Sequence, residues 1–198
     1  MKTLASLLLA VGLATVASGQ GLINRRAPSF SLPDSTFTQF DILDYRGKWL
    51  LIEFMQTNAG SCPTCRELTK KLEALKVKHG AKLAVLAILT TPPETQQTAG
   101  AYVNETKTTI PMLFDSSMVA MAYFKATPQR PAIDIPHIFA VNPQGTIIRD
   151  WSQVLAANPA FSGEVDQMIS SAPGTPAEVP AKSTPAKSEP KTKASKSK

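Results

Sequence analysis

Hydrophobic residues along the middle of the chain alternate between strand-like and helix-like patterns. The run Trp49–Met55 is almost continuously apolar and is short enough for a strand that is buried on both faces. From Arg66 to Lys78, leucines follow at helical spacing with lysines on the opposite side. Gly80 comes shortly after, where a helix C-terminus favours glycine. The sequence therefore predicts a buried strand that leads into an amphipathic helix.

The same alternation continues to residue 170. The further elements that we predict are a strand over 82–89, a helix opened by Pro92-Pro93-Glu94 and reaching about Glu105, a strand over 111–114, a short helix over 116–124, strands over 137–141 and 146–151, and a helix over 159–170. The two late strands flank Asn142-Pro143-Gln144-Gly145, which is typical of an antiparallel hairpin. Strand–helix alternation followed by a hairpin and a helix predicts an α/β fold with a central mixed, mostly parallel sheet flanked by helices.

The N-terminal end has a different composition. Lys2 precedes an uncharged apolar run, Leu4–Ala17, and small residues follow before Gln20. This pattern is typical of a secretory signal peptide, and the run is shorter than the roughly 20 residues that cross a bilayer. We therefore expect residues 1–19 to be a cleaved signal peptide and the protein to be exported, to a periplasmic or extracellular location. An uncleaved membrane anchor is the alternative.

The C-terminal segment 173–198 consists of Pro, Ala, Lys, Ser, Thr and Glu with one Gly, and Val179 is its one larger apolar residue. Such a segment cannot bury enough surface to offset the entropy of ordering it. We expect a disordered tail after a domain that spans 20–172. The tail serves either as a solvated spacer or for a weak electrostatic contact with an anionic envelope surface.

The net charge of +6 is concentrated at the ends of the chain. The tail supplies +4, from six Lys and two Glu, and Lys2 supplies +1, so the remainder is nearly neutral. A nucleic-acid-binding domain would carry its basic excess on the folded part. We therefore expect no nucleic-acid partner.

The two cysteines of the chain, Cys62 and Cys65, lie where the predicted strand meets the predicted helix. This number excludes a disulfide-stapled scaffold and a four-cysteine metal site. We place Cys62 at the helix N-terminus, where unpaired N–H groups and the helix dipole stabilise the thiolate that attacks disulfides, and Cys65 one less exposed turn further along. The spacing predicts a redox-active pair in which Cys62 attacks and Cys65 resolves. Metal-binding or inert cysteines are the alternatives, although the histidine positions do not fit a zinc finger.

These features together resemble a known family. The strand 50–54, the Cys62-Pro63-Thr64-Cys65 helix start, and Ile135-Pro136 before the late hairpin are similar to the thioredoxin fold. The resemblance covers roughly residues 27–170. It implies a thiol-disulfide oxidoreductase that acts on protein thiols and disulfides and exchanges electrons with a redox partner protein. We expect no cofactor, no resident metal and a monomer.

Two further segments resemble a subgroup of that fold. Ala27-Pro28-Ser29-Phe30-Ser31-Leu32 and Asp44-Tyr45-Arg46-Gly47-Lys48 are similar to the beginning of the exported TlpA/ResA-type proteins and of the broader redoxin group. The stretch that ends with Ile110-Pro111-Met112-Leu113-Phe114-Asp115 also fits this subgroup. The resemblance thus implies an N-terminal extension and a central insertion.

The resemblance also implies roles for three residues. Pro136 is implied to be a cis-proline that sits against the disulfide and, together with Ile135, helps to bind an extended substrate chain. Glu53 is implied to be a buried acid that carries protons from the resolving thiol. In an apolar strand the pKa of the Glu53 carboxyl should be raised, which suits a proton carrier near neutral pH.

The chain departs from the family pattern close to the cysteines. Ser61 stands where the family has an aromatic residue, and the segment 56–61 is longer than the usual loop. The acid that ResA-type proteins carry three residues after the second cysteine is replaced by Leu68, with Glu67 one place early. The loop 125–134 is also long, and we expect it beside Pro136 at the rim of the site.

Two other functions compete with this interpretation. A copper carrier could use the thiolates of Cys62 and Cys65 with His137 as a third ligand. The sequence Cys62-Pro63-Thr64 suggests a peroxiredoxin-type antioxidant. A peroxidatic site, however, also requires Thr or Ser three residues before the cysteine and Pro seven residues before it. Here those positions hold Ala59 and Met55.

Overall fold

The computed structural model describes residues 21–89, 94–127, 129 and 133–171. The expected signal peptide and the expected tail lie outside the described residues. The strands are β1 (Arg25–Arg26), β2 (Ser31–Pro33), β3 (Gln39–Asp41), β4 (Trp49–Met55), β5 (Leu83–Leu89), β6 (Met112–Phe114), β7 (His137–Val141) and β8 (Thr146–Trp151). The α-helices are α1 (Cys65–His79), α2 (Gln96–Thr106), α3 (Met118–Phe124), α4 (Gln153–Ala157) and α5 (Phe161–Ser171), and short 3-10 turns occupy Ile42–Tyr45 and Gly80–Lys82.

The central sheet is mixed, as the sequence predicted. Its strand order is β1-β8-β7-β4-β5-β6. The pairings β4–β5 and β5–β6 are parallel, whereas β4–β7, β7–β8 and β8–β1 are antiparallel. The parallel part is thus smaller than the expected majority, because the late hairpin adds two antiparallel pairings and β1 of the N-terminal extension adds a third at its edge.

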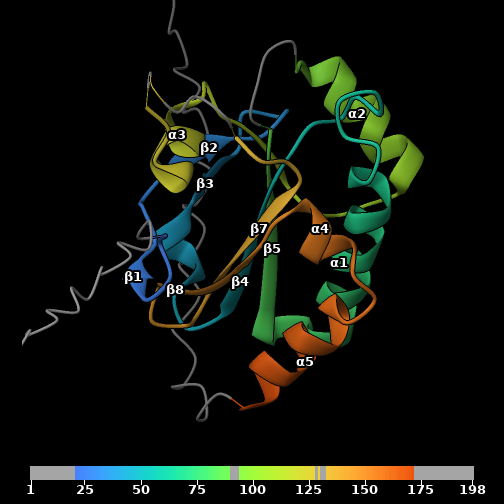
Figure 1. Cartoon of the computed structure of the whole chain (residues 1–198). Helices are drawn as coiled ribbons and strands as arrows, with labels where there is room; N and C mark the ends of the chain where they lie inside the picture. Colours follow the sequence, from blue (N-terminus) through green and yellow to red (C-terminus); the bar gives the residue numbers. More distant parts are fainter. Residues whose placement is uncertain (1–20, 90–93, 128, 130–132, 172–198) are drawn as a thin grey trace, which may run out of the picture.

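Strand β4 lies at the centre of the sheet, and all seven of its residues are buried. Side chains of successive strand residues point to opposite faces. Leu51 and Met55 pack on the side of α1 and α5, whereas Leu50, Ile52 and Phe54 pack on the side of α3 and the N-terminal extension. The sheet is therefore covered on both faces, by helices on the α1 side and by α3 with the N-terminal extension on the other (Figure 1), which explains the continuous apolar run in the sequence.

Helix α1 packs against the sheet through Leu68, Leu72 and Leu75, the leucines that predicted it. At its C-terminal end, Lys78 donates a 2.6 Å hydrogen bond to Asp166 of α5, and His79 Nε2 lies 2.7 Å from the other oxygen of that carboxylate. Both contacts involve positive or polar groups at the negative end of the helix dipole, and they join α1 to α5.

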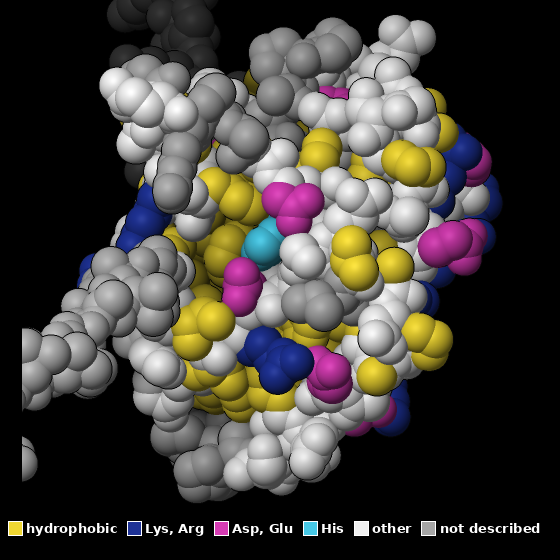
Figure 2. All heavy atoms as spheres, in the orientation of Figure 1, with side chains coloured by type: hydrophobic (Ala, Val, Ile, Leu, Met, Phe, Trp, Pro, Cys, Tyr) yellow, Lys and Arg dark blue, Asp and Glu magenta, His cyan; other side chains and the backbone are white. Residues whose placement is uncertain are grey.

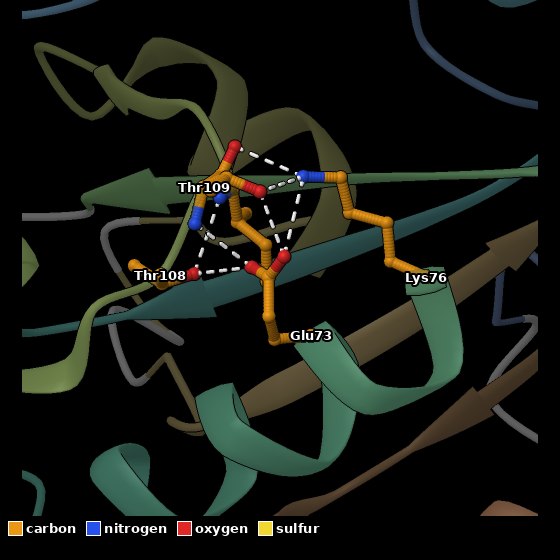
Figure 3. A network of polar contacts seen from close by, with 5 residues as sticks. Glu73, Lys76, Thr108 and Thr109 are labelled. Atoms are coloured by element: carbon orange, nitrogen blue, oxygen red, sulfur yellow. Dashed lines mark hydrogen bonds and ion pairs between the residues drawn. The ribbon is translucent and has the colours of Figure 1, made fainter. Parts of the chain in front are cut away.

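A carboxylate on α1 holds the chain that returns from α2 to β6 (Figure 3). Glu73 accepts hydrogen bonds from the Thr108 hydroxyl (2.7 Å), the Thr109 backbone N–H (2.9 Å) and the Thr109 hydroxyl (2.7 Å). Lys76 donates to the carbonyl of Thr109 at 3.0 Å. Burial raises the pKa of Glu73, but the hydrogen bonds from Thr109 and Thr108 and the charge of Lys76 outweigh it, so the net pKa is lowered. The carboxylate is therefore charged, and both of its oxygens accept hydrogen bonds in this contact.

The second helix starts slightly later than the sequence predicted. Its first residue is Gln96, and Thr95 is its N-cap, with reciprocal hydrogen bonds between Thr95 and Thr98 that form a capping box. Pro92 and Pro93, which predicted the start, lie outside the described residues. No helix in the described part of the chain is long and apolar enough to cross a membrane.

Candidate active site

The two cysteines are joined by a disulfide between the end of β4 and the start of α1. Their Cα atoms are 5.4 Å apart. A turn positions Cys62: its N–H donates to the carbonyl of Asn58 at 2.9 Å, and its own carbonyl accepts from the N–H of Cys65 at 3.3 Å. The sequence prediction of a cysteine pair at a strand–helix junction is confirmed.

The structure modifies the predicted placement of Cys62 in one respect. The first residue of α1 is Cys65, and Thr64 is the N-cap, so Cys62 lies in the turn before the helix rather than in its first turn. Its sulfur is still bonded to a residue at the helix start. In this bonded state Cys62 is 2% exposed and Cys65 0%, so the expected difference in exposure is small.

The Ile135–Pro136 peptide bond is cis. Pro136 lines a groove of about 170 Å³ together with Pro63, Thr64 and residues of α1 and α4. The α1 and α4 residues that line it are Glu67, Leu68, Lys71, Gln153, Ala156 and Ala157. The structure thus brings Pro136 to Pro63 and Thr64, the two residues between the cysteines.

Ile135 does not line this groove. Its side chain is half-buried and packs with the apolar residues on the α3 side of the sheet. Of the neighbouring loop 125–134, which we expected at the rim, residues 128 and 130–132 lie outside the described residues. A contact of Ile135 with substrate would therefore use its backbone next to Pro136.

Glu53 is fully buried in the middle of β4, between Ala87 of β5 and Ile138 of β7. Strand alternation places its side chain on the α1 side of the sheet, the side on which Cys62 and Cys65 are packed. Neither carboxylate oxygen has a hydrogen-bond partner among the described residues. Burial raises the pKa of Glu53 from 4.5 to about 8. The expected raised pKa is confirmed, and the group can change its protonation state near neutral pH.

Further polar side chains lie between α1 and α2, close to this carboxyl. The hydroxyls of Thr69 and Tyr102 are 2.9 Å apart, and both residues are buried. Burial, opposed by the Thr69 hydrogen bond and assisted by the charge of Glu53, raises the pKa of Tyr102. At the surface end, Arg66 pairs with Glu105 at 2.8 Å. Glu53 is therefore within electrostatic reach of the α1–α2 contact.

His137 is paired with carboxylates at both ring nitrogens. Nδ1 lies 3.3 Å from Asp134, Nε2 lies 3.0 Å from Asp150, and the residue is 8% exposed. Among the described residues, no group of three or more His, Cys, Asp or Glu side chains could hold a metal ion. His137 packs against Phe124 and Phe139 on the α3 side of the sheet, whereas Cys62 and Cys65 belong to the core on the α1 side. The three ligands of the copper alternative therefore lie on opposite sides of the sheet.

Charged side chains of both signs are spread over the surface of the described residues. On the face shown in Figure 2, the described basic side chains are few and separated, with acidic and apolar side chains between them. Several basic groups are paired, such as Lys70 with Glu67 at 2.9 Å and Arg149 with Glu164 at 2.6 Å. This face of the described residues carries no continuous basic stripe of the kind that tracks a phosphate backbone.

Comparison with known proteins places the chain in a family. Residues 23–149, more than half of the sequence, match the AhpC/TSA family. The chain belongs to the AhpC/TSA family. This confirms the redoxin resemblance and supports the predicted oxidoreductase role. A curated relative, the thioredoxin-like protein YneN of Bacillus subtilis, is 28% identical over 100 residues, which cover 50% of this chain and 57% of that protein. The chain therefore matches a little over half the length of this relative.

Solved structures share the fold of this AhpC/TSA-family chain. The thioredoxin domain of a thiol-disulfide oxidoreductase from Bacteroides vulgatus has a TM-score of 0.59 at 17% identity, covering 74% of this chain and 97% of that one. A thiol-disulfide oxidoreductase from Bacteroides fragilis has a TM-score of 0.57 at 20% identity, covering 73% and 99%. A secreted Mycobacterium tuberculosis disulfide oxidoreductase, homologous to DsbE of Escherichia coli, has a TM-score of 0.55 at 17% identity, covering 72% and 96%. At these identities the likeness shows the fold, and it confirms the thioredoxin-fold prediction.

Sequence reasoning missed two parts of the site. Helix α4, which forms one wall of the groove, is only five residues long, too short for helical periodicity to reveal it. The contact between Thr57 and Glu94 at the loop before Cys62 joins residues 37 positions apart. No local sequence pattern marks such a contact. The unusual length of segment 56–61 indicated only that this loop departs from the family pattern.

Proposed function

We propose that this protein is an exported thiol-disulfide oxidoreductase that exchanges disulfides with protein substrates through Cys62 and Cys65. The observation that carries the proposal is the bonded cysteine pair beside a groove lined by the cis-proline Pro136. A groove of this kind, next to a reactive sulfur, suits an extended polypeptide that brings its own disulfide or thiols to the pair. Membership of the AhpC/TSA family supports redox chemistry at this cysteine pair.

Reduction of a substrate proceeds in two exchanges. The Cys62 thiolate attacks one sulfur of the substrate disulfide, a Cys62–substrate bond forms, and the other substrate sulfur leaves as a thiolate. Cys65 then loses its proton, attacks the Cys62 sulfur, and releases the second substrate thiolate as the Cys62–Cys65 disulfide closes. Two electrons pass from the protein dithiol to the substrate, and oxidation of a substrate dithiol is the reverse sequence.

Glu53 is the proposed acceptor of the Cys65 proton. Its pKa of about 8 is close to that of a thiol. Proton transfer between the two groups is therefore nearly balanced in free energy in either direction. Cys65 is the first residue of α1, where the positive end of the helix dipole favours the thiolate that results. In this scheme the substrate protein reacts with Cys62, and Glu53 accepts the proton of Cys65.

The spacing of the cysteines argues against the peroxiredoxin alternative. A peroxidatic cysteine would not normally have its partner three residues further on, as Cys62 has in Cys65. Ala59 and Met55 also lack the side chains that such a site requires. We therefore give disulfide exchange precedence over peroxide reduction.

The proposal is tested by trapping. In Cys65→Ser the mixed disulfide has no neighbouring thiol to release it, so covalent adducts with client proteins should accumulate on a non-reducing gel and dissolve with reductant. Cys62→Ser should accumulate few, because the remaining thiol of Cys65 belongs to a buried residue within α1, whereas Cys62 lies in the turn before the helix. The double variant Cys62→Ser/Cys65→Ser is the control and should trap nothing.

Two results would contradict the assignment of roles. Equal trapping by the two single variants would mean that the cysteines are interchangeable. An absence of adducts with Cys65→Ser, under conditions in which the wild-type pair cycles between dithiol and disulfide, would mean that Cys62 is not the attacking group.

Export is the second part of the proposal. It is supported by Lys2 and the apolar run Leu4–Ala17, and a secreted oxidoreductase of similar fold is known. The full chain expressed in a bacterium should be recovered from the envelope or the medium with an N-terminus at or next to Gln20, as measured by mass spectrometry. Recovery in the cytoplasm with Met1 retained would refute export.

A further inference from the structure

The loop before the attacking cysteine is exposed, but its first residue, Thr57, is held by hydrogen bonds to a side chain from another part of the fold. Asn58, Ala59, Gly60 and Ser61 are exposed, whereas Thr57 on one side and Cys62 on the other are buried. Exposed loop residues have few packing contacts to restrain them. The contacts of Thr57 therefore contribute to the position of the loop that leads to Cys62.

The side chain that holds Thr57 comes from Glu94, next to the N-cap of α2. One oxygen of the Glu94 carboxylate accepts the backbone N–H of Thr57 at 2.8 Å. The other accepts the hydroxyl of Thr57 at 2.5 Å and the hydroxyl of Thr98 at 2.8 Å. Because Thr98 is also bonded to the N-cap Thr95, the carboxylate is itself fixed to the first turn of α2.

The restraint passes from Thr57 to Cys62 through a closed turn. The side chain of Asn58 accepts the N–H of Gly60 at 2.7 Å, and the carbonyl of Asn58 accepts the N–H of Ser61 at 3.1 Å and that of Cys62 at 2.9 Å. Glu94 is thus connected to the attacking cysteine by hydrogen bonds to Thr57, one peptide bond, and one further hydrogen bond.

We propose that Glu94 is a positioning residue for the cysteine pair: by holding Thr57 it fixes the loop 57–62, and so keeps the Cys62 sulfur within reach of Cys65 when the disulfide is open. The inference rests on the proposed disulfide exchange and adds a residue to it. In the dithiol the covalent restraint between the sulfurs is lost, and the hydrogen bonds of the loop act together with the packing of the two cysteines in the core to keep the sulfurs close. A fixed loop raises the effective concentration of one sulfur at the other and favours ring closure.

The experiment measures the equilibrium between dithiol and disulfide against reduced and oxidised glutathione. Glu94→Ala should shift this equilibrium toward the dithiol by about tenfold, which corresponds to about 30 mV for a two-electron couple. Thr57→Val keeps the backbone N–H contact and loses the hydroxyl contact, so it should shift the equilibrium in the same direction by about threefold. Glu94→Gln, which retains one acceptor oxygen, should lie between wild type and Glu94→Ala.

Glu73→Ala is a matched control. Glu73 also binds a threonine N–H and two threonine hydroxyls (Figure 3), but the chain that it holds is the segment before β6 and not the loop before Cys62. This variant should unfold at lower urea concentration than wild type and yet show the wild-type glutathione equilibrium. A general loosening of the fold is thereby separated from a specific effect on the cysteine pair.

The proposal is overturned if Glu94→Ala stays within twofold of the wild-type equilibrium, or if Glu73→Ala shifts it as far. Should Glu94→Ala not fold, Thr57→Val and Glu94→Gln decide by the same criterion. The measurement needs only a cysteine pair that opens and closes with glutathione. Failure of Cys65→Ser to trap clients would count against the proposed function and would leave the comparison of Glu94 with Glu73 intact.

Discussion

Replacement of Glu53 by Gln should make the protein less sensitive to alkaline pH. The carboxyl is fully buried, its oxygens have no partner among the described residues, and burial raises its pKa from 4.5 to about 8. The folded state therefore binds this proton more tightly than the unfolded chain does. Below pH 4.5 the group is neutral in both states and has no effect. As the pH rises toward 8, the unfolded chain releases the proton while the folded protein keeps it, so the stability of the wild type falls.

The magnitude follows from the two pKa values. Each tenfold change in proton affinity corresponds to about 1.4 kcal/mol. The rise from 4.5 to about 8 then corresponds to roughly 5 kcal/mol in full, of which about 3–4 kcal/mol falls between pH 5 and pH 8. Gln has a similar shape and does not titrate. Between those two pH values the wild type should therefore lose about 3–4 kcal/mol relative to Glu53→Gln.

The assay is urea unfolding of the oxidised proteins at pH 5, 6.5 and 8. Glu67→Gln is the control, because Glu67 is exposed, and it should follow the pH dependence of the wild type. If Glu53→Gln and the wild type kept a constant stability difference over this range, to within about 1 kcal/mol, Glu53 would not be a buried acid with a raised pKa. Its proposed role as proton acceptor would then fall with it.

Three further outcomes are expected. His137→Ala should leave the affinity of the reduced protein for Cu(I) nearly unchanged in a competition titration, because both ring nitrogens are paired with carboxylates; loss of tight one-to-one binding in the variant would support the copper carrier. Leu72→Ala should lower the free energy of unfolding, measured in urea, by about 2–5 kcal/mol, because this side chain of α1 is completely buried against the sheet. A loss below about 1 kcal/mol would contradict that packing. Gly145→Ala should lower the melting temperature, because Gly145 has φ +82° and an added Cβ would overlap the guanidinium of Arg46; an unchanged melting temperature would refute this turn geometry.

The sequence alone determined the elements whose signals are local. The apolar run of β4, the leucine spacing of α1 and the turn residues between β7 and β8 each identify one element without reference to the rest of the chain. The position of Cys62 and Cys65 at the strand–helix junction followed from the order of two such elements. Their chemistry could be predicted because a helix start affects a thiolate in the same way in any fold.

The tertiary structure decided whatever depends on residues distant in sequence. The side of the sheet on which Glu53 is buried depends on the strand neighbours Ala87 and Ile138. The antiparallel share of the sheet depends on the pairing of β1 with β8, in which Arg25 pairs with Ile147 and Arg26 with Thr146, residues 122 and 120 positions apart. The anchoring of the loop before Cys62 depends on Glu94, which reaches Thr57 only once α2 has packed. Such contacts are selected by the free energy of the whole packed chain, and single polar residues in a local stretch of sequence do not record which distant partner they will meet.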